Sequence, residues 1–315
     1  MGISFAALMS ANPLRIHGTA MAPNLLLMCK IIAVAMLGVN HWRELPTPFL
    51  PFVPGLDQLV DPATFQFTLR IVFFVSAAML LLNRCVRLSA FTLGSCLLLA
   101  VVSSKAYYGN NKMFCGLCLV LASISDREGP PYLLRLQFSI VYFGAALNKL
   151  IDPDWQSGVF FENWARNRLE QPVYIALADR LPPLVAGKIM CWGTALAELF
   201  MAVGVFVPRL VPWALWTHVL FQVGLLEFTG TTFNLFFFGM LAATLIFVDW
   251  PKEEEPPDGM AARLLYAPAL WLVLTLLIAY PLLEPVLWRR VLVAAALLIG
   301  SVAWWVVSPM RMQGK

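Results

Sequence analysis

Ionisable side chains stand inside several long apolar segments of the sequence, where a charge is costly. Lys30, Glu198 and His218 lie well within such segments, and Lys149 lies at the end of another. A charge in a membrane helix costs at least about 2.5 kcal/mol on insertion scales, so each of these residues is a functional candidate. Lys149 has a simpler alternative, because a lysine at a helix end can extend its ammonium group to the membrane surface.

The remaining three residues form a candidate polar core. An unpaired buried carboxylate is too costly, so Glu198 needs either a proton or a cationic partner, for which Lys30 is one candidate. His218 suits either a proton relay or a packed, hydrogen-bonded position. Histidines occur only at positions 17, 41 and 218, without the spacing of a catalytic zinc site, so we expect no metal.

Other chemistries find little support in the sequence. The nucleotide-binding motifs GxGxxG and GxxxxGK[ST] are absent, as are the hydrolase motif GxSxG and the zinc motif HExxH. Cys115 and Cys118 have the CxxC spacing of a redox pair, but cysteines inside an apolar helix usually pack as small apolar residues. The net charge of +4 is spread out, and this argues against nucleic acid as a partner.

The composition is that of a protein with many membrane spans. Of the 315 residues, 60% are hydrophobic and only 13% are charged, whereas soluble domains carry about 25% charged residues. The apolar runs are continuous, without the alternation of barrel strands, and only helices or closed barrels satisfy backbone groups in lipid. The sequence therefore predicts an all-α, polytopic transmembrane helical bundle with an eight-span core and about two C-terminal spans. The predicted spans are Pro23–Val39, Phe65–Leu82, Leu88–Ser103, Met113–Ser125, Leu133–Leu150, Leu184–Val207, Pro212–Leu226, Thr232–Val248, Leu264–Leu282 and Leu287–Val307.

Two polar stretches organise the chain. The acidic, proline-rich residues 252–263 separate a core at residues 1–251 from the C-terminal spans and short tail at residues 264–315. Within the core, Asp152–Pro183 is the longest polar stretch, and its segment Phe160–Leu169 fits either a helix lying in the membrane interface or an ordinary folded loop. We expect an integral multi-pass protein of a bacterial inner membrane or a eukaryotic endomembrane.

The segment Leu136–Gly158, LQFSIVYFGAALNKLIDPDWQSG, closely resembles the signature of the vitamin K-dependent gamma-carboxylases and the wider HTTM family. In that signature, a span ending in Lys-Leu runs into a short acidic loop with Asp-Trp and a following glycine. Further pieces of the chain resemble the family in the same order. These pieces are Asn24–Gly38 with Lys30, Ser104–Gly116, Gly193–Phe206 with Glu198, and Phe233–Pro251.

The resemblance implies a reaction and its participants. Lys149 matches the amine base that deprotonates reduced vitamin K or another quinol, after which reaction with O2 gives an epoxide and a much stronger base. That base removes a γ-hydrogen from a peptide glutamate, and the resulting carbanion captures CO2. The expected partners are the bilayer, a lipid-soluble quinone, and a peptide or soluble protein. The residues expected to bind the quinone are Asn110, Asn111, Lys112, Tyr142 and Trp155.

Two departures from the family limit what carries over. Lys112 stands where the family has a histidine, and an ammonium group lacks the donor–acceptor chemistry of a neutral imidazole. Nothing after Pro251 resembles the large luminal domain of the animal carboxylases, so a propeptide-directed carboxylase is disfavoured.

Three readings follow: a compact carboxylase-like enzyme, a non-catalytic bundle that binds a quinone, lipid or partner protein, and, ranked last, a transporter. The enzyme reading expects Lys149 to line an apolar cavity near Asn110 or Asn111. The hypothesis of Lys149 as the base fails if its ammonium group points to the lipid headgroups or is held in a buried salt bridge.

Overall fold

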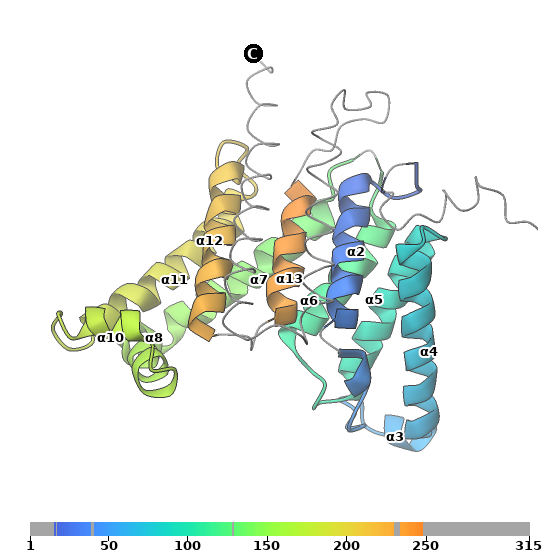
Figure 1. Ribbon diagram of the computed structural model, residues 1–315, viewed down its shortest axis with the longest axis horizontal. Helices are drawn as coiled ribbons and strands as arrows, with labels where there is room; N and C mark the ends of the chain where they lie inside the picture. The colour runs from blue at the N-terminus through green and yellow to red at the C-terminus, as the bar shows by residue number, and fades with distance from the viewer. Residues whose placement is uncertain (1–15, 17, 39–40, 128, 230–233, 248–315) are drawn as a thin grey trace, which may run out of the picture. The chain divides into compact units, whose positions relative to one another are not determined.

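A computed structural model of the chain describes residue 16 and residues 18–38, 41–127, 129–229 and 234–247. Within these ranges the chain is helical and contains no strand, which confirms the all-α prediction for this part of the sequence. The longer helices coincide with the predicted core segments because each is built from a continuous apolar run. They are α2 (Pro23–Gly38), α4 (Pro62–Leu81), α5 (Val86–Ser103), α6 (Asn110–Ile124), α7 (Tyr132–Ile151), α11 (Val185–Gly204), α12 (Val211–Thr229) and α13 (Asn234–Ala243) (Figure 1).

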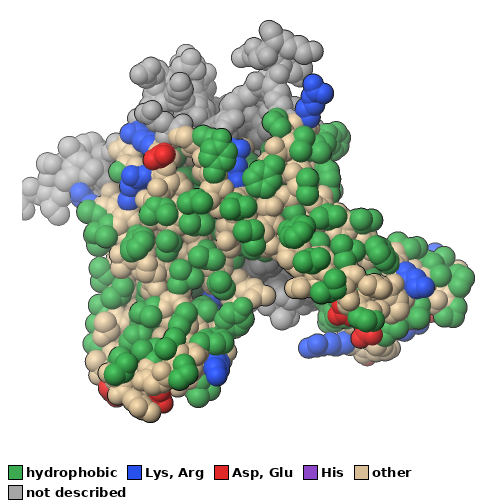
Figure 2. Space-filling view, turned by 180° about the vertical axis from the view of Figure 1, so that it is seen from behind, with side chains coloured by type: hydrophobic (Ala, Val, Ile, Leu, Met, Phe, Trp, Pro, Cys, Tyr) green, Lys and Arg blue, Asp and Glu red, His purple; other side chains and the backbone are tan. Residues whose placement is uncertain are grey.

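The described surface fits a membrane protein. Three helices, α4, α5 and α11, are long and apolar enough to cross a bilayer, and α2 and α6 are shorter apolar helices. Large side chains such as Phe67, Ile140 and Leu196 are more than half exposed. Hydrophobic side chains cover most of the face in Figure 2, and soluble monomers rarely expose contiguous apolar surface on this scale. The count of eight crossings stays a prediction, and residues 252–263 and 264–315 lie outside the described ranges.

The chain divides into two compact units, and the division falls inside the predicted core. The first unit consists of Met1–Leu134 and Asn234–Val306, and the second of Arg135–Phe233 and Val307–Lys315. In the first unit, α5 and α6 pack closely against each other. A Cβ atom built on Gly94 of α5 would lie 2.7 Å from the carbonyl oxygen of Gly116 on α6. Small residues of this kind let two membrane helices approach closely.

A late segment of the chain completes the first unit. Helix α13 packs against α2, and the following turn η4 (Thr244–Phe247) accepts a hydrogen bond of 3.0 Å from the side-chain amide of Asn24 to the carbonyl of Leu245. The first unit also contains the short elements η1 (His41–Glu44) and α3 (Leu56–Leu59).

The second unit consists mainly of α7, α11 and α12, with a polar hairpin between α7 and α11. The hairpin contains α8 (Pro153–Ser157), α9 (Val159–Phe161), the π-helix η2 (Glu162–Arg168) and α10 (Pro172–Ala178). Of the two predictions for Phe160–Leu169, the helical one is confirmed, while its position in the membrane interface stays a prediction. Figure 1 shows α8 and α10 beside one end of α11.

Local sequence explains how α7 ends and the hairpin begins. The carboxylate of Asp152 accepts a hydrogen bond of 2.9 Å from the backbone N–H of Asp154, and Pro153 occupies the first turn of α8. An N-cap acid followed by proline is a typical helix start. Gly158, with φ of +85°, then ends α8 in a left-handed conformation that costs glycine little.

Candidate functional site

Lys149 and Glu198 form an ion pair between α7 and α11. The Nζ atom of Lys149 lies 2.8 Å from each carboxylate oxygen of Glu198, and it also donates to the carbonyl of Ala145 at 3.4 Å. The two side chains are only 17% and 6% exposed. An ion pair in such a position holds its two helices in register, because either charge alone would be costly there.

The pair gives Glu198 the cationic partner that its position requires. The sequence offered Lys30 for this role, whereas in the structure both carboxylate oxygens contact Lys149. Lys30 belongs to the first unit, where it is 1% exposed within α2.

An aromatic side chain of the polar hairpin contacts Lys149. The ring centroid of Trp155 lies 5.0 Å from the Nζ atom of Lys149, within the range of a cation–π contact. Phe160 stacks on Trp155, with their ring centroids 4.3 Å apart and an angle of 18° between the rings. The turn that follows α7 therefore lies next to Lys149.

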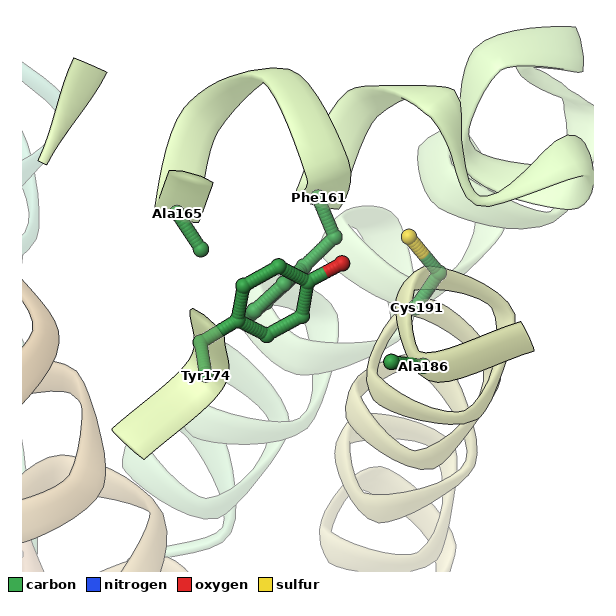
Figure 3. Packing of buried hydrophobic residues seen from close by; sticks show 5 residues of the cluster. All are labelled: Phe161, Ala165, Tyr174, Ala186 and Cys191. Atoms are coloured by element: carbon green, nitrogen blue, oxygen red, sulfur yellow. The ribbon is translucent and has the colours of Figure 1, made fainter. Parts of the chain in front are cut away.

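A small hydrophobic core positions this aromatic turn. Figure 3 shows the ring of Tyr174 among side chains from the hairpin and from α11, and Trp155 packs against the same group. The cluster consists of Phe161, Ala165, Tyr174, Ala186 and Cys191.

Ion pairs between charged side chains of the hairpin also stabilise it. Arg166 donates to Glu162, and its Nη1 atom lies 2.9 Å from Asp179. Tyr174 donates its hydroxyl to Glu162, and burial together with this carboxylate holds the pKa of Tyr174 above its ordinary value. The hydrogen bonds to Asp179 and Glu162 likewise raise the pKa of Arg166.

A second polar group lies between α7 and α12. The hydroxyl of Tyr142 lies 2.6 Å from Nδ1 of His218, and Nε2 of Gln222 donates to the same hydroxyl at 2.8 Å. The rings of Phe138 and Phe221 pack edge-on against Tyr142. The structure thus brings together Tyr142 and His218, which the sequence had assigned separate roles.

Gln222 is the site residue that sequence reasoning missed. It lies one helical turn after His218 on α12, so the two share a face. A single amide in an apolar run gives a weaker signal than a charge, and the four-residue spacing from His218 was the only clue available.

Asn110, Asn111 and Lys112 belong to the first unit, so their sharing of a site with Lys149 stays a prediction. The side-chain oxygen of Asn110 accepts from the hydroxyl of Tyr108, and that of Asn111 accepts from the backbone N–H of Lys112, both at 2.9 Å. Both asparagines lie in the first turn of α6, and in each of these two hydrogen bonds the side-chain oxygen is the acceptor.

Lys112 itself is largely buried. Its Nζ atom donates to the carbonyl of Tyr107 at 2.8 Å and lies 3.7 Å from Glu44. Burial, with a contribution from the Lys112 charge, lowers the pKa of the nearby His41 to about 4.

Metal binding finds no support in the described ranges, where no group of three or more His, Cys, Asp or Glu residues could hold an ion. The described cysteines are free thiols, and Cys115 and Cys118 are both buried. Cys115 packs tightly, because a Cβ atom on Gly239 of α13 would lie 2.6 Å from its sulfur.

Comparison with known protein families gives a match to one domain. Residues 130–250 match the HTTM domain. The resemblance seen in the sequence is therefore confirmed for this segment, and the carboxylase-like assignment within it stays a prediction. Neither the search of curated proteins nor the search of solved structures gave a match. The HTTM segment includes the ion pair of Lys149 and Glu198 and the group of Tyr142, His218 and Gln222, whereas Asn110, Asn111 and Lys112 precede it.

Proposed function

We propose that this protein is a carboxylase-like membrane enzyme that removes a proton from a lipid-soluble quinol at the Lys149–Glu198 pair. The contact of the Lys149 ammonium group with both oxygens of Glu198, beside the ring of Trp155, is the observation that carries the proposal. The HTTM match over residues 130–250 supports it, because this domain occurs in vitamin K-dependent carboxylase-like proteins.

The ion pair changes which atom accepts the proton. An ammonium group that contacts both oxygens of a carboxylate is not a free amine, which argues against Lys149 as the base by itself. In the proposed step, Glu198 takes the proton from a quinol hydroxyl, and the electron pair of the broken O–H bond stays on the quinol oxygen. The Lys149 ammonium group then pairs with that oxygen in place of the neutralised carboxyl group.

Charge balance favours this step in a largely buried site. One carboxylate disappears as one phenolate forms, so the ammonium group keeps an anionic partner and the net charge of the site is unchanged. Preorganised charges of this kind stabilise a developing anion at little reorganisation cost.

The residues beside the pair fit a flat ring that carries a hydroxyl group. Trp155, which stacks on Phe160, lies next to the Lys149 ammonium group, and aromatic side chains stack well with other rings. Reduced vitamin K or another quinol would supply, with O2 and CO2, the chemistry for glutamate carboxylation or a related oxidation. No metal takes part in this proposal.

A non-catalytic bundle that binds a quinone, lipid or partner protein is the second candidate. The observation that favours it is the completeness of the ion pair, in which both carboxylate oxygens are already bound and the side chains are largely buried. In that case the pair would only join α7 to α11.

One assay separates the two candidates. Membranes containing the protein receive reduced vitamin K, labelled bicarbonate and a glutamate peptide, and epoxide and incorporated label are measured. We expect Glu198→Gln to lower epoxide formation by about 10²–10⁴-fold, the usual contribution of a positioned proton acceptor. Lys149→Ala should also lower it, because the quinol anion then lacks its cationic partner. The matched controls Glu170→Gln and Lys188→Ala alter exposed residues of the same unit and should retain activity.

The outcomes have distinct meanings. Epoxide without carboxylation would support quinol deprotonation with an acceptor other than glutamate. Absence of epoxide from the wild-type protein with several quinols would contradict the enzyme and favour the binding bundle.

A further inference from the structure

Tyr142, His218 and Gln222 form a polar centre that is almost completely shielded from solvent. Their exposed fractions are 2%, 0% and 1%. Buried polar groups persist in a hydrophobic surrounding only when hydrogen bonds compensate the loss of water. Tyr142 meets this requirement through His218 and Gln222, which contact its hydroxyl at 2.6 Å and 2.8 Å.

Gln222 has only part of the hydrogen bonding that its burial requires. Its Nε2 atom donates to Tyr142, but its Oε1 atom is buried and has no hydrogen-bond partner in the structure. A buried acceptor without a donor costs about 1–3 kcal/mol. Oε1 is therefore an acceptor that an O–H or N–H donor could satisfy.

The centre lies on the same face of α7 as the ion pair. Tyr142 and Lys149 are seven residues apart, which is two helical turns and a rise of about 10 Å. The Lys149 ammonium group reaches back to the carbonyl of Ala145, which shortens the distance between the two polar groups.

Small side chains separate the two polar groups along α7. Ala145 and Ala146 occupy the turn between Tyr142 and Lys149, and Ala146 is fully buried.

We propose that the substrate is a diol of the quinol type that uses both groups, with one hydroxyl at Lys149–Glu198 and the other donating to Oε1 of Gln222. This inference rests on the proposed function and adds a second binding residue and a selectivity. The oxidised quinone has carbonyl oxygens in both positions and cannot donate to Gln222. The site therefore selects the reduced form.

Ligand binding without turnover tests the inference. The protein in lipid nanodiscs is titrated under anaerobic conditions with 1,4-naphthohydroquinone, with its monomethyl ether, and with 1,4-naphthoquinone, and heat is measured by calorimetry. We expect the wild type to bind the hydroquinone about 10-fold more tightly than the ether or the quinone, the effect of one hydrogen bond to a buried acceptor.

The decisive variant is Gln222→Leu, which keeps the side-chain volume and removes the acceptor. It should bind all three ligands with similar affinity, while Gln137→Leu, a matched change elsewhere in the second unit, should retain the 10-fold preference. Thermal unfolding checks that both variants remain folded. If Gln222→Leu unfolds, Tyr142→Phe replaces it, because loss of the phenol removes the contact that orients Gln222 and should reduce the preference.

Two results would overturn the inference in different ways. A preference for the hydroquinone that survives in Gln222→Leu would place a water molecule or another donor at Oε1 and leave the proposed function intact. Absence of binding of any of the three ligands to the wild type would contradict the quinol function and the inference together.

Discussion

At the scale of single residues, Lys149 and Glu198 are stable in their buried positions only because they form an ion pair with each other. Both oxygens of Glu198 contact one ammonium group, and neither side chain is more than 17% exposed. Removal of one charge leaves the other buried without a partner, whereas removal of both leaves an apolar contact.

This asymmetry predicts a double-mutant result for stability. Glu198→Leu should lower the free energy of unfolding by about 3–5 kcal/mol, because Lys149 is then unpaired. The double variant Lys149→Met/Glu198→Leu should be more stable than the single one. Unfolding by SDS titration in mixed micelles measures both. Equal stability of the single and double variants would contradict a coupled pair.

His41, which lies outside the membrane helices, should make the stability of the fold depend on pH. Burial and the nearby Lys112 charge lower its pKa to about 4 in the folded chain, with Glu44 acting in the opposite direction, whereas an unfolded histidine has a pKa of about 6.5. The unfolded state therefore binds the proton first, and stability present above pH 6.5 should decrease as the pH falls towards 4. Thermal unfolding at pH 7.5 and pH 5 measures this decrease. It should be smaller in His41→Asn, and an unchanged decrease would exclude His41 as its source.

At the scale of elements, the contact between the hairpin and α11 positions the aromatic turn at Lys149. A Cβ atom on Gly187 of α11 would collide with the carbonyl oxygen of Gly158, and Gly158 itself has a positive φ. Both glycines are therefore required by the close approach of the two backbones.

A glycine comparison tests this contact. Gly187→Ala should destabilise the second unit and reduce the protection of the hairpin from proteolysis. The control is Gly193→Ala in the same helix, where a Cβ atom meets nothing within 4 Å. This change should be neutral or stabilise the helix by up to about 1 kcal/mol. Equal effects of the two changes would argue against the tight contact.

The elements also show which features the sequence could predict. Continuous apolar runs place helices well, and for this reason the longer helices from α2 to α13 were foreseen. The pairing of Lys149 with Glu198, which are 49 positions apart in the sequence, depends on how α7 and α11 pack, and periodicity carries no such information. The sequence left Phe160–Leu169 open between helix and loop, because its aromatic and charged residues follow helical spacing only roughly; in the structure this segment is mostly π-helix.

At the scale of the whole molecule, the candidate chemistry is concentrated in one of the two units. The HTTM match at residues 130–250 contains Arg135–Phe233, the main part of the second unit. The ion pair, the aromatic turn and the group around Gln222 all lie there. The first unit carries the tight α5–α6 pair and the buried Lys30 and Lys112.

The central claim is that the Lys149–Glu198 pair removes a proton from a quinol, and an anaerobic spectrum tests it most directly. Without O2, a quinol bound to the wild-type protein should show the red-shifted absorption of its anion at pH 7. Glu198→Gln should show only the neutral quinol, and Glu170→Gln should match the wild type. A neutral spectrum for quinol bound to the wild-type protein, or an anion spectrum that persists in Glu198→Gln, would contradict the account.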